Sequence, residues 1–448
     1  MKNIKYKVLG VALSIMALQS CKLEVVNDPN FPSVGAVTSN ASKAQLDALA
    51  IGSFSAARNG LATYTQVTGV VGKEVFNFNT TESRWWTELN GLRPIDNSAF
   101  YNTATTAFGL PVRQANIILA ACDKTSLVTD AQKSAYKGVA NTFKGLAYLY
   151  MLNAQGKNGV RLNVEDPFNP SKPATYAESL AGIAKILDDG ASQLDGAGAA
   201  FPFAAPSGFN AGTAGTSFNT PANFKKFNRA IAARVALYQG DYAKVSTLLG
   251  QSFLALAGDL NIGPKHTFSP SSPDFANPLL NTSSVRVVAI NKNWDALDKA
   301  DKRLSKLAVQ TPSISYSAAG TTYDSKYLTN MFKLATDPFA IIRNEELMLM
   351  AAEVAAATGK EADALSIINT VRTANGSKAL TNVVGKDNLI NAVLEERYYS
   401  LFYEGHRWVD MRRLGKLAQI ELPVAGMKVL EQLERPVQEV NWDNRVVK

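Results

Sequence analysis

Cysteine and histidine are scarce in this chain of 448 residues, which contains two of each. The histidines, His266 and His406, supply a zinc site or a Ser-His-Asp triad poorly. No glycine-rich loop of the kind that cradles phosphate is present. These absences argue against a zinc enzyme and a serine hydrolase, and we expect no cofactor and no catalytic metal.

Long runs of one charge are also missing. The formal net charge is +8, and Lys2, Lys5 and Lys7 near the start supply three of the positive charges. Without a block rich in lysine and arginine, the chain has no phosphate-binding footprint, so we expect no nucleic-acid partner. After the first 20 residues no apolar run approaches eighteen residues, so we expect no transmembrane helix.

The first residues have the pattern of a processed leader. Basic residues precede an apolar run of eleven residues, 8–18, and Leu18-Gln19-Ser20-Cys21 places a small residue directly before a cysteine. This pattern looks like a bacterial lipobox, and the alternative is an ordinary secretory signal with an incidental cysteine. We expect residues 1–20 to be a signal peptide and residues 21–40 a polar tether lipidated at Cys21. Cys122 then has no partner for a disulfide within the chain.

Most of the remaining chain has helical periodicity. Apolar residues recur at three- and four-residue spacing, and Ser42 is placed to cap the first helix. The predicted helices span residues 42–58, 112–121, 131–154 and 177–194. Two further segments, 230–243 and 350–365, combine small residues, a glycine at a turn and a returning helix. We therefore predict a mostly α fold over residues 41–448, with tetratricopeptide-like helix pairs.

Three stretches interrupt this scaffold and are rich in Gly, Asn, Ser, Thr and Pro. They span residues 61–111, 155–223 and 253–342. We expect them to be loop-rich insertions, and loops on a rigid scaffold often hold binding residues.

The most informative insertion segment is 73–90, because it combines aromatic and polar groups. A sugar ring stacks its C–H face on an aromatic plane and offers hydroxyls to amide, carboxylate and guanidinium groups. Candidate ligand-binding residues here are Trp85, Trp86, Arg84, Asn77, Asn79 and Glu82. Neighbours in an extended segment point opposite ways, so we expect one tryptophan to pack into the core and the other to face the ligand.

A second candidate clamp lies near residue 294. Trp294 is flanked by amides and a carboxylate, and Asn293 and Tyr323 join it as candidate ligand-binding residues. Ordinary core packing of Trp294 is the competing interpretation.

The C-terminal segment 394–415, L-E-E-R-Y-Y-S-L-F-Y-E-G-H-R-W-V-D-M-R-R-L-G, predicts two helices that meet near Gly405. Glu395, Glu396 and Glu404 are in reach of arginines on the second helix. We interpret them as a structural ion-pair network that locks packed helices, and the alternative is a catalytic or partner-binding carboxylate cluster.

This segment resembles the C-terminal signature of the SusD/RagB family, which are surface lipoproteins that capture nutrients for outer-membrane transporters of Bacteroidetes. The upstream runs R-N-E-E-L-M-L-M-A-A-E (343–353) and A-L-S-I-I-N-T-V-R (364–372) resemble the paired helices of that family. The resemblance implies a scaffold of helix pairs, with a ligand face lined by loops such as 73–90.

The resemblance to the SusD/RagB family also implies a function. The protein would be a lipid-anchored, cell-surface protein of the outer membrane that captures an oligosaccharide and delivers it to a SusC-like TonB-dependent transporter, without acting as an enzyme. One alternative is peptide capture, as on the RagB side of the family. The other is a surface glycoside hydrolase, whose acids would come from Glu74, Glu82 and Glu88 near the tryptophans.

Overall fold

The computed structural model describes residues 34–166, 168–210 and 217–445. The expected signal peptide, Cys21 and most of the tether lie outside the described residues. Residues 34–39 of the expected tether form a short helix, α2 (Val34–Ser39), which contacts α7 (Gly109–Lys124) and buries Val37. This end of the expected tether is therefore part of the fold.

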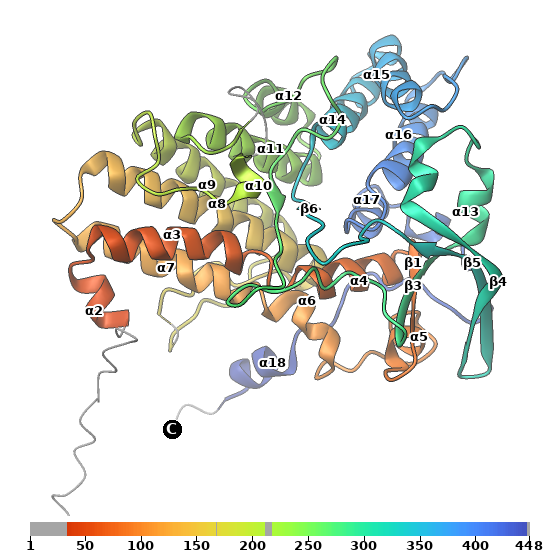
Figure 1. The fold of residues 1–448 in the computed structure, drawn as a ribbon, viewed down its shortest axis with the longest axis horizontal. Coiled ribbons are helices and arrows are strands. Elements are labelled where there is room, and N and C mark those ends of the chain that lie inside the picture. Colours follow the sequence, from red (N-terminus) through yellow and green to blue (C-terminus); the bar gives the residue numbers. More distant parts are fainter. Residues whose placement is uncertain (1–33, 167, 211–216, 446–448) are drawn as a thin grey trace, which may run out of the picture.

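The fold is mostly α, as the periodicity predicts (Figure 1). The four predicted helices correspond to α3 (Lys43–Ala56), α7, α8 (Asp130–Gln155) and α9 (Tyr176–Asp195). Ser42 caps α3 as expected, because its Oγ accepts a hydrogen bond from the Gln45 N–H while the Gln45 side chain accepts one from the Ser42 N–H. Further helices are α4 (Leu61–Val71), α6 (Thr103–Thr106), α10 (Ser207–Asn210) and α18 (Val437–Asp443).

The two predicted hairpins are also present. They are α11 (Pro221–Gln239) with α12 (Tyr242–Gly250), and α14 (Asn344–Ala357) with α15 (Glu361–Ala374). Gly240 and Gly359 turn the chain with φ of 74° and 78°, a conformation that glycine adopts without strain. Close packing of α8 on α9 also requires glycine, since a Cβ at Gly145 would lie 2.7 Å from Leu187.

The insertions contain more regular structure than their composition predicts. Residues 253–342 hold β3 (Val285–Ala289), β4 (Leu307–Ala318) and β5 (Thr321–Thr329), which join β1 (Val75–Asn79) in an antiparallel sheet of order β1-β3-β5-β4. Two-residue strands β2 (Lys265–His266) and β6 (Phe339–Ala340) form a second pair. Thr, Ser and Tyr suit a half-exposed hairpin as well as a loop, which explains the missed strands. The expectation that residues 61–111 are irregular is likewise wrong at α4.

The C-terminal signature folds into α16 (Lys386–Ser400) and α17 (Arg407–Arg413), joined by a tight turn. Gly405 has φ of 85°, and a Cβ there would lie 2.6 Å from Tyr64 of α4. Both the backbone angle and the space therefore require glycine at this corner, as its position in the sequence suggests.

A network of buried ion pairs surrounds this corner. Arg397 and Arg413 both pair with Asp410, at 2.7 and 2.9 Å, and Arg413 also pairs with Glu353 of α14. The network matches the structural interpretation of the sequence, but the partners of the glutamates differ from those expected. Glu396 pairs with Arg303 and Arg372, and Glu404 pairs with Arg343, because these cations come from chain segments distant in sequence.

A second buried pair joins the two hairpins. Arg234 of α11 forms two hydrogen bonds to Glu346 of α14, at 2.7 and 2.6 Å, and both side chains are almost fully buried. Burial acts to raise the pKa of Glu346, but the neighbouring cations, Arg234 first, outweigh it and lower the pKa to about 2. The carboxylate is therefore ionised and paired across the physiological pH range.

We predict that Glu346→Gln destabilises the protein by roughly 3–5 kcal/mol, because it leaves Arg234 buried without a countercharge. Urea unfolding measures this change. The control is Lys185→Ala, which breaks an exposed pair with Asp189 and should cost about 0.5 kcal/mol or less. Equal effects of the two substitutions would contradict the importance of the buried pair.

Candidate ligand-binding site

The polar residues expected to bind ligand after β1 are engaged within the protein. Asn79 Oδ1 accepts hydrogen bonds from the backbone N–H groups of Thr81 and Glu82, both at 2.9 Å. Asn77 is buried and donates to the Gln66 side chain. Both asparagines belong to β1, and Asn79 holds the turn that follows the strand.

Both tryptophans of this loop are buried, which corrects the expectation that one of them faces the ligand. Trp86 is fully buried, packs against Phe76 at 5.0 Å between ring centroids, and donates its Nε1–H to Thr321. Trp85 is 7% exposed and packs against Phe100. The reason is that residues 84–87 form a helical turn, α5 (Arg84–Thr87), in place of a strand with one exposed face, and the two rings enter different core clusters.

An ion pair between Arg84 and Glu82 lies at the surface of this loop. Arg84 contacts the Glu82 carboxylate through two nitrogens, at 2.9 and 2.6 Å, and its guanidinium lies over the Phe100 ring. The hydrogen bond from Arg84 holds the pKa of Glu82 below its usual range. Glu82 is therefore ionised, which does not suit a general acid.

Trp294 is also fully buried, so it offers no ring face to a sugar, and this corrects the second expected clamp. It lies in α13 (Asn291–Ala296) and packs edge-on against Phe402 and Tyr399, at 4.8 and 5.3 Å. Its neighbour Asn293 lies at the surface of the same helix and donates to the Tyr398 hydroxyl at 3.0 Å. Thus α13 is anchored by its tryptophan and presents its polar residues.

Tyr323 belongs to the sheet. Its hydroxyl accepts a hydrogen bond from the Asn291 N–H, and its ring packs against Phe76.

The expected ligand-binding residues near α5 and those near α13 lie in two separate places. Because β1 and β3 are antiparallel, α5 after β1 and α13 after β3 lie at opposite ends of these strands.

A cleft of about 400 Å³ opens beside α13, between this helix, α16, α17 and the turn η4 (Leu417–Gln419). Its lining contains amide, carboxylate, guanidinium, ammonium and phenol groups. These come from Lys292, Asn293, Asn391, Glu395, Tyr398, Tyr399, Arg407 and Gln419. Of the expected ligand-binding residues, Asn293 is the one that lines this cleft.

Two charged groups of the cleft are available to a ligand. The Arg407 guanidinium lies 5.3 Å from the centre of the Tyr398 ring, and neither Arg407 nor Glu395 forms an ion pair with another described residue. Burial raises the pKa of the Tyr398 phenol, which keeps the hydroxyl protonated. The sequence predicts Glu395 in a structural network, and this is wrong because the structure leaves Glu395 exposed while it buries its neighbour Glu396.

Comparison with known proteins finds a family model that matches the C-terminal part of the chain. Residues 315–446 match the model of the SusD family. This C-terminal part of the chain is therefore similar to the SusD/RagB family. A curated relative, SusD-like protein P38 of Formosa agariphila, is 27% identical over 127 residues, and the matched region covers 25% of this chain and 25% of that protein.

Solved structures extend the similarity to most of the chain. A SusD superfamily protein of Bacteroides vulgatus matches with a TM-score of 0.63 and 14% identity, covering 90% of this chain and 97% of that one. Surface glycan-binding protein A of Bacteroides thetaiotaomicron, solved with laminarihexaose, matches with a TM-score of 0.68 and 13% identity, covering 90% and 98%. A laminarin-binding SusD-like protein matches with a TM-score of 0.64 and 16% identity, covering 90% of this chain and 98% of that one. At these identities the likeness shows a shared SusD-like fold.

Glu88 and Glu74 are the other two acids considered for a glycoside hydrolase, and both contact the interior of this SusD-like fold. Glu88 accepts a hydrogen bond from the Tyr101 hydroxyl at 2.6 Å. Glu74 is almost fully buried, and burial raises the pKa of its carboxyl to about 8, with only partial opposition from the Tyr403 backbone and Arg407. Glu74 is therefore a neutral carboxylic acid in the core at neutral pH.

This environment predicts a pH effect on stability. The folded protein retains the Glu74 proton up to about pH 8, whereas the unfolded chain releases it near pH 4.5. The stabilisation is thus fully present below about pH 4.5 and is lost as the pH rises through about 8, at up to about 1.4 kcal/mol per pH unit. We predict that Glu74→Gln gains stability relative to the wild type from pH 5 to pH 8, measured by urea unfolding at each pH. Parallel pH profiles for the two proteins would contradict a buried neutral Glu74.

Proposed function

We propose that this SusD-like protein captures an oligosaccharide at the cell surface and binds it in the cleft beside α13. The observation that carries the proposal is a polar cleft in which Arg407 and Glu395 lie beside Tyr398 without an ion-pair partner among the described residues. The SusD-like fold supports it, since two proteins that share this fold are described as binding glycans.

The lining suits sugar hydroxyls. Asn293, Asn391 and Gln419 offer both donors and acceptors, Glu395 accepts, and Arg407 donates several hydrogen bonds in one plane. Vicinal hydroxyl pairs of a pyranose match such planar groups. In this proposal the glycan is bound and released without any bond being broken.

The cellular location that we propose rests on the leader sequence and on the similarity to the SusD/RagB family. Residues 1–20 would be removed, Cys21 would carry the lipid, and residues 41–448 would form the binding domain on the outer surface of the outer membrane. The glycan would then pass to a SusC-like TonB-dependent transporter. Among the described residues, none of the helices combines the length and the apolar character needed to cross a bilayer.

Cleft substitutions test the binding proposal. In calorimetry against a panel of plant, host and microbial glycans, we expect Asn293→Ala and Arg407→Ala each to weaken binding of the best ligand about tenfold, because each removes hydrogen bonds to the sugar. Lys185→Ala, an exposed residue of α9 outside the cleft, is the matched control and should bind normally. Unchanged affinity in both cleft variants would refute this site.

Product analysis of the same mixtures separates the alternatives. New reducing ends would indicate a glycoside hydrolase, and binding of peptides in place of every glycan would indicate a RagB-like role. Intact glycan with saturable binding is the result expected here.

Lipid attachment has its own test. Metabolic labelling of the full chain with a radioactive fatty acid should label the wild type and Cys122→Ala equally and leave Cys21→Ala unlabelled. Cys122 is a suitable control because it is the buried free cysteine of the described residues. Label that persists in Cys21→Ala would contradict the proposed anchor.

A further inference from the structure

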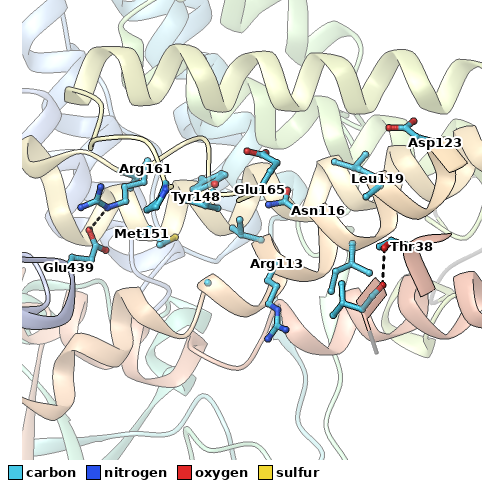
Figure 2. Close-up of a pocket in the computed structure, with 18 of the residues that line it drawn as sticks. Thr38, Arg113, Asn116, Leu119, Asp123, Tyr148, Met151, Arg161, Glu165 and Glu439 are labelled. Carbon is cyan, nitrogen blue, oxygen red and sulfur yellow. Dashed lines mark hydrogen bonds and ion pairs between the residues drawn. The ribbon is translucent and has the colours of Figure 1, made fainter. Parts of the chain in front are cut away.

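A separate and larger groove lies on the N-terminal helices, away from the α13 cleft. Its volume is about 840 Å³, and it lies between α2, α7 and α8, with the loop around residue 164 and α18 at one end (Figure 2). Most of its lining is aliphatic. The apolar lining residues are Val34, Val112, Ile117, Leu119, Ala120, Met151, Val160, Val164 and Pro170.

Most charged groups at the rim of the groove are already paired within the protein. Arg161 pairs with Asp443 and Glu439, and Glu165 pairs with Lys144. Figure 2 shows the Arg161–Glu439 pair at one end and Thr38 at the other. This apolar floor with a satisfied rim does not suit a sugar, whose hydroxyls need free hydrogen-bonding partners.

Two polar groups on α7 stand out from this pattern. The Asn116 Oδ1 atom is buried and accepts no hydrogen bond from any described residue. Arg113 is exposed and lacks an ion-pair partner in the part of the chain that the structure describes. A backbone N–H and a carboxylate on an occupant of the groove would satisfy both.

The chain itself supplies such an occupant. Val34 is both the first residue of α2 and a lining residue, so the segment 22–33 joins the fold directly at the groove. Its apolar residues are Leu23, Val25, Val26, Pro29, Phe31 and Pro32, and Glu24 and Asp28 carry its acidic charges. Twelve extended residues reach roughly 40 Å, whereas α7, which forms one wall, is only about 24 Å long.

We propose that residues 22–33 of this chain dock into the groove in extended form. Their apolar side chains cover the aliphatic floor, a backbone N–H reaches Asn116, and an acidic side chain pairs with Arg113. If Cys21 is lipidated, as in the proposed function, docking shortens the free tether to the residues next to the lipid and fixes which face of the domain meets the membrane.

Photo-crosslinking in the full chain tests this proposal. With p-benzoylphenylalanine in place of Phe31, we expect intramolecular crosslinks to peptides that contain Leu119 or Met151, located by mass spectrometry. Leu119→Glu should reduce their yield at least tenfold, because a charge on the floor opposes apolar docking. Leu334→Glu, which is also a surface leucine but lies outside the groove, should leave the yield unchanged. Crosslinks to a second copy, to lipid or to other surfaces would overturn the proposal.

A second variant avoids changes to the folded helices. Val26→Asp/Phe31→Asp alters the segment alone and should raise the fluorescence of a hydrophobic dye several-fold, because it uncovers the groove. Adding Leu119→Glu should remove that increase. An unchanged dye signal in the segment variant would show that the segment does not cover the groove.

Discussion

Buried charge pairing between distant segments is the constraint on which this structure depends. Helix pairs with small residues at their contacts pack closely but specify their neighbours weakly. Arg234 with Glu346 joins the two hairpins, and Arg413 joins Glu353 to Asp410 at the C-terminal corner. Because an unpaired buried charge is costly, each pair permits one arrangement of the helices that carry it. We therefore infer that the pairs act on the specificity of packing more than on net stability.

The proposed glycan cleft depends on this frame. Its walls come from α13 in an insertion and from α16 and α17 in the C-terminal signature, segments about a hundred residues apart. Trp294 holds α13 in place by packing against Phe402. The tryptophan that the sequence offers as a sugar platform thus acts one layer below the surface, where it positions Asn293. The apolar groove and the polar cleft separate two tasks, because an aliphatic floor suits a chain segment and a polar lining suits a sugar.

Local features were predictable from the sequence because their causes are local. The capping box of Ser42, the left-handed turn at Gly240 and the apolar stripes of the long helices are all set by neighbouring residues. The partners of Glu396 were not predictable, because Arg303 and Arg372 reach it only after folding. The expectation that one of Trp85 and Trp86 faces the ligand is wrong for a related reason. Their exposure depends on whether residues 84–87 form a turn or a strand, and for Trp86 also on the sheet that covers it.

The central claim is that a glycan occupies the cleft beside α13. The most direct test is a crystal structure of the protein with the glycan that binds it best in solution. The account predicts electron density for a sugar in contact with Asn293 and Arg407, with Trp85, Trp86 and Trp294 still buried. Density for the sugar at the Glu82–Arg84 loop or in the groove of α7 and α8, with an empty α13 cleft, would contradict it.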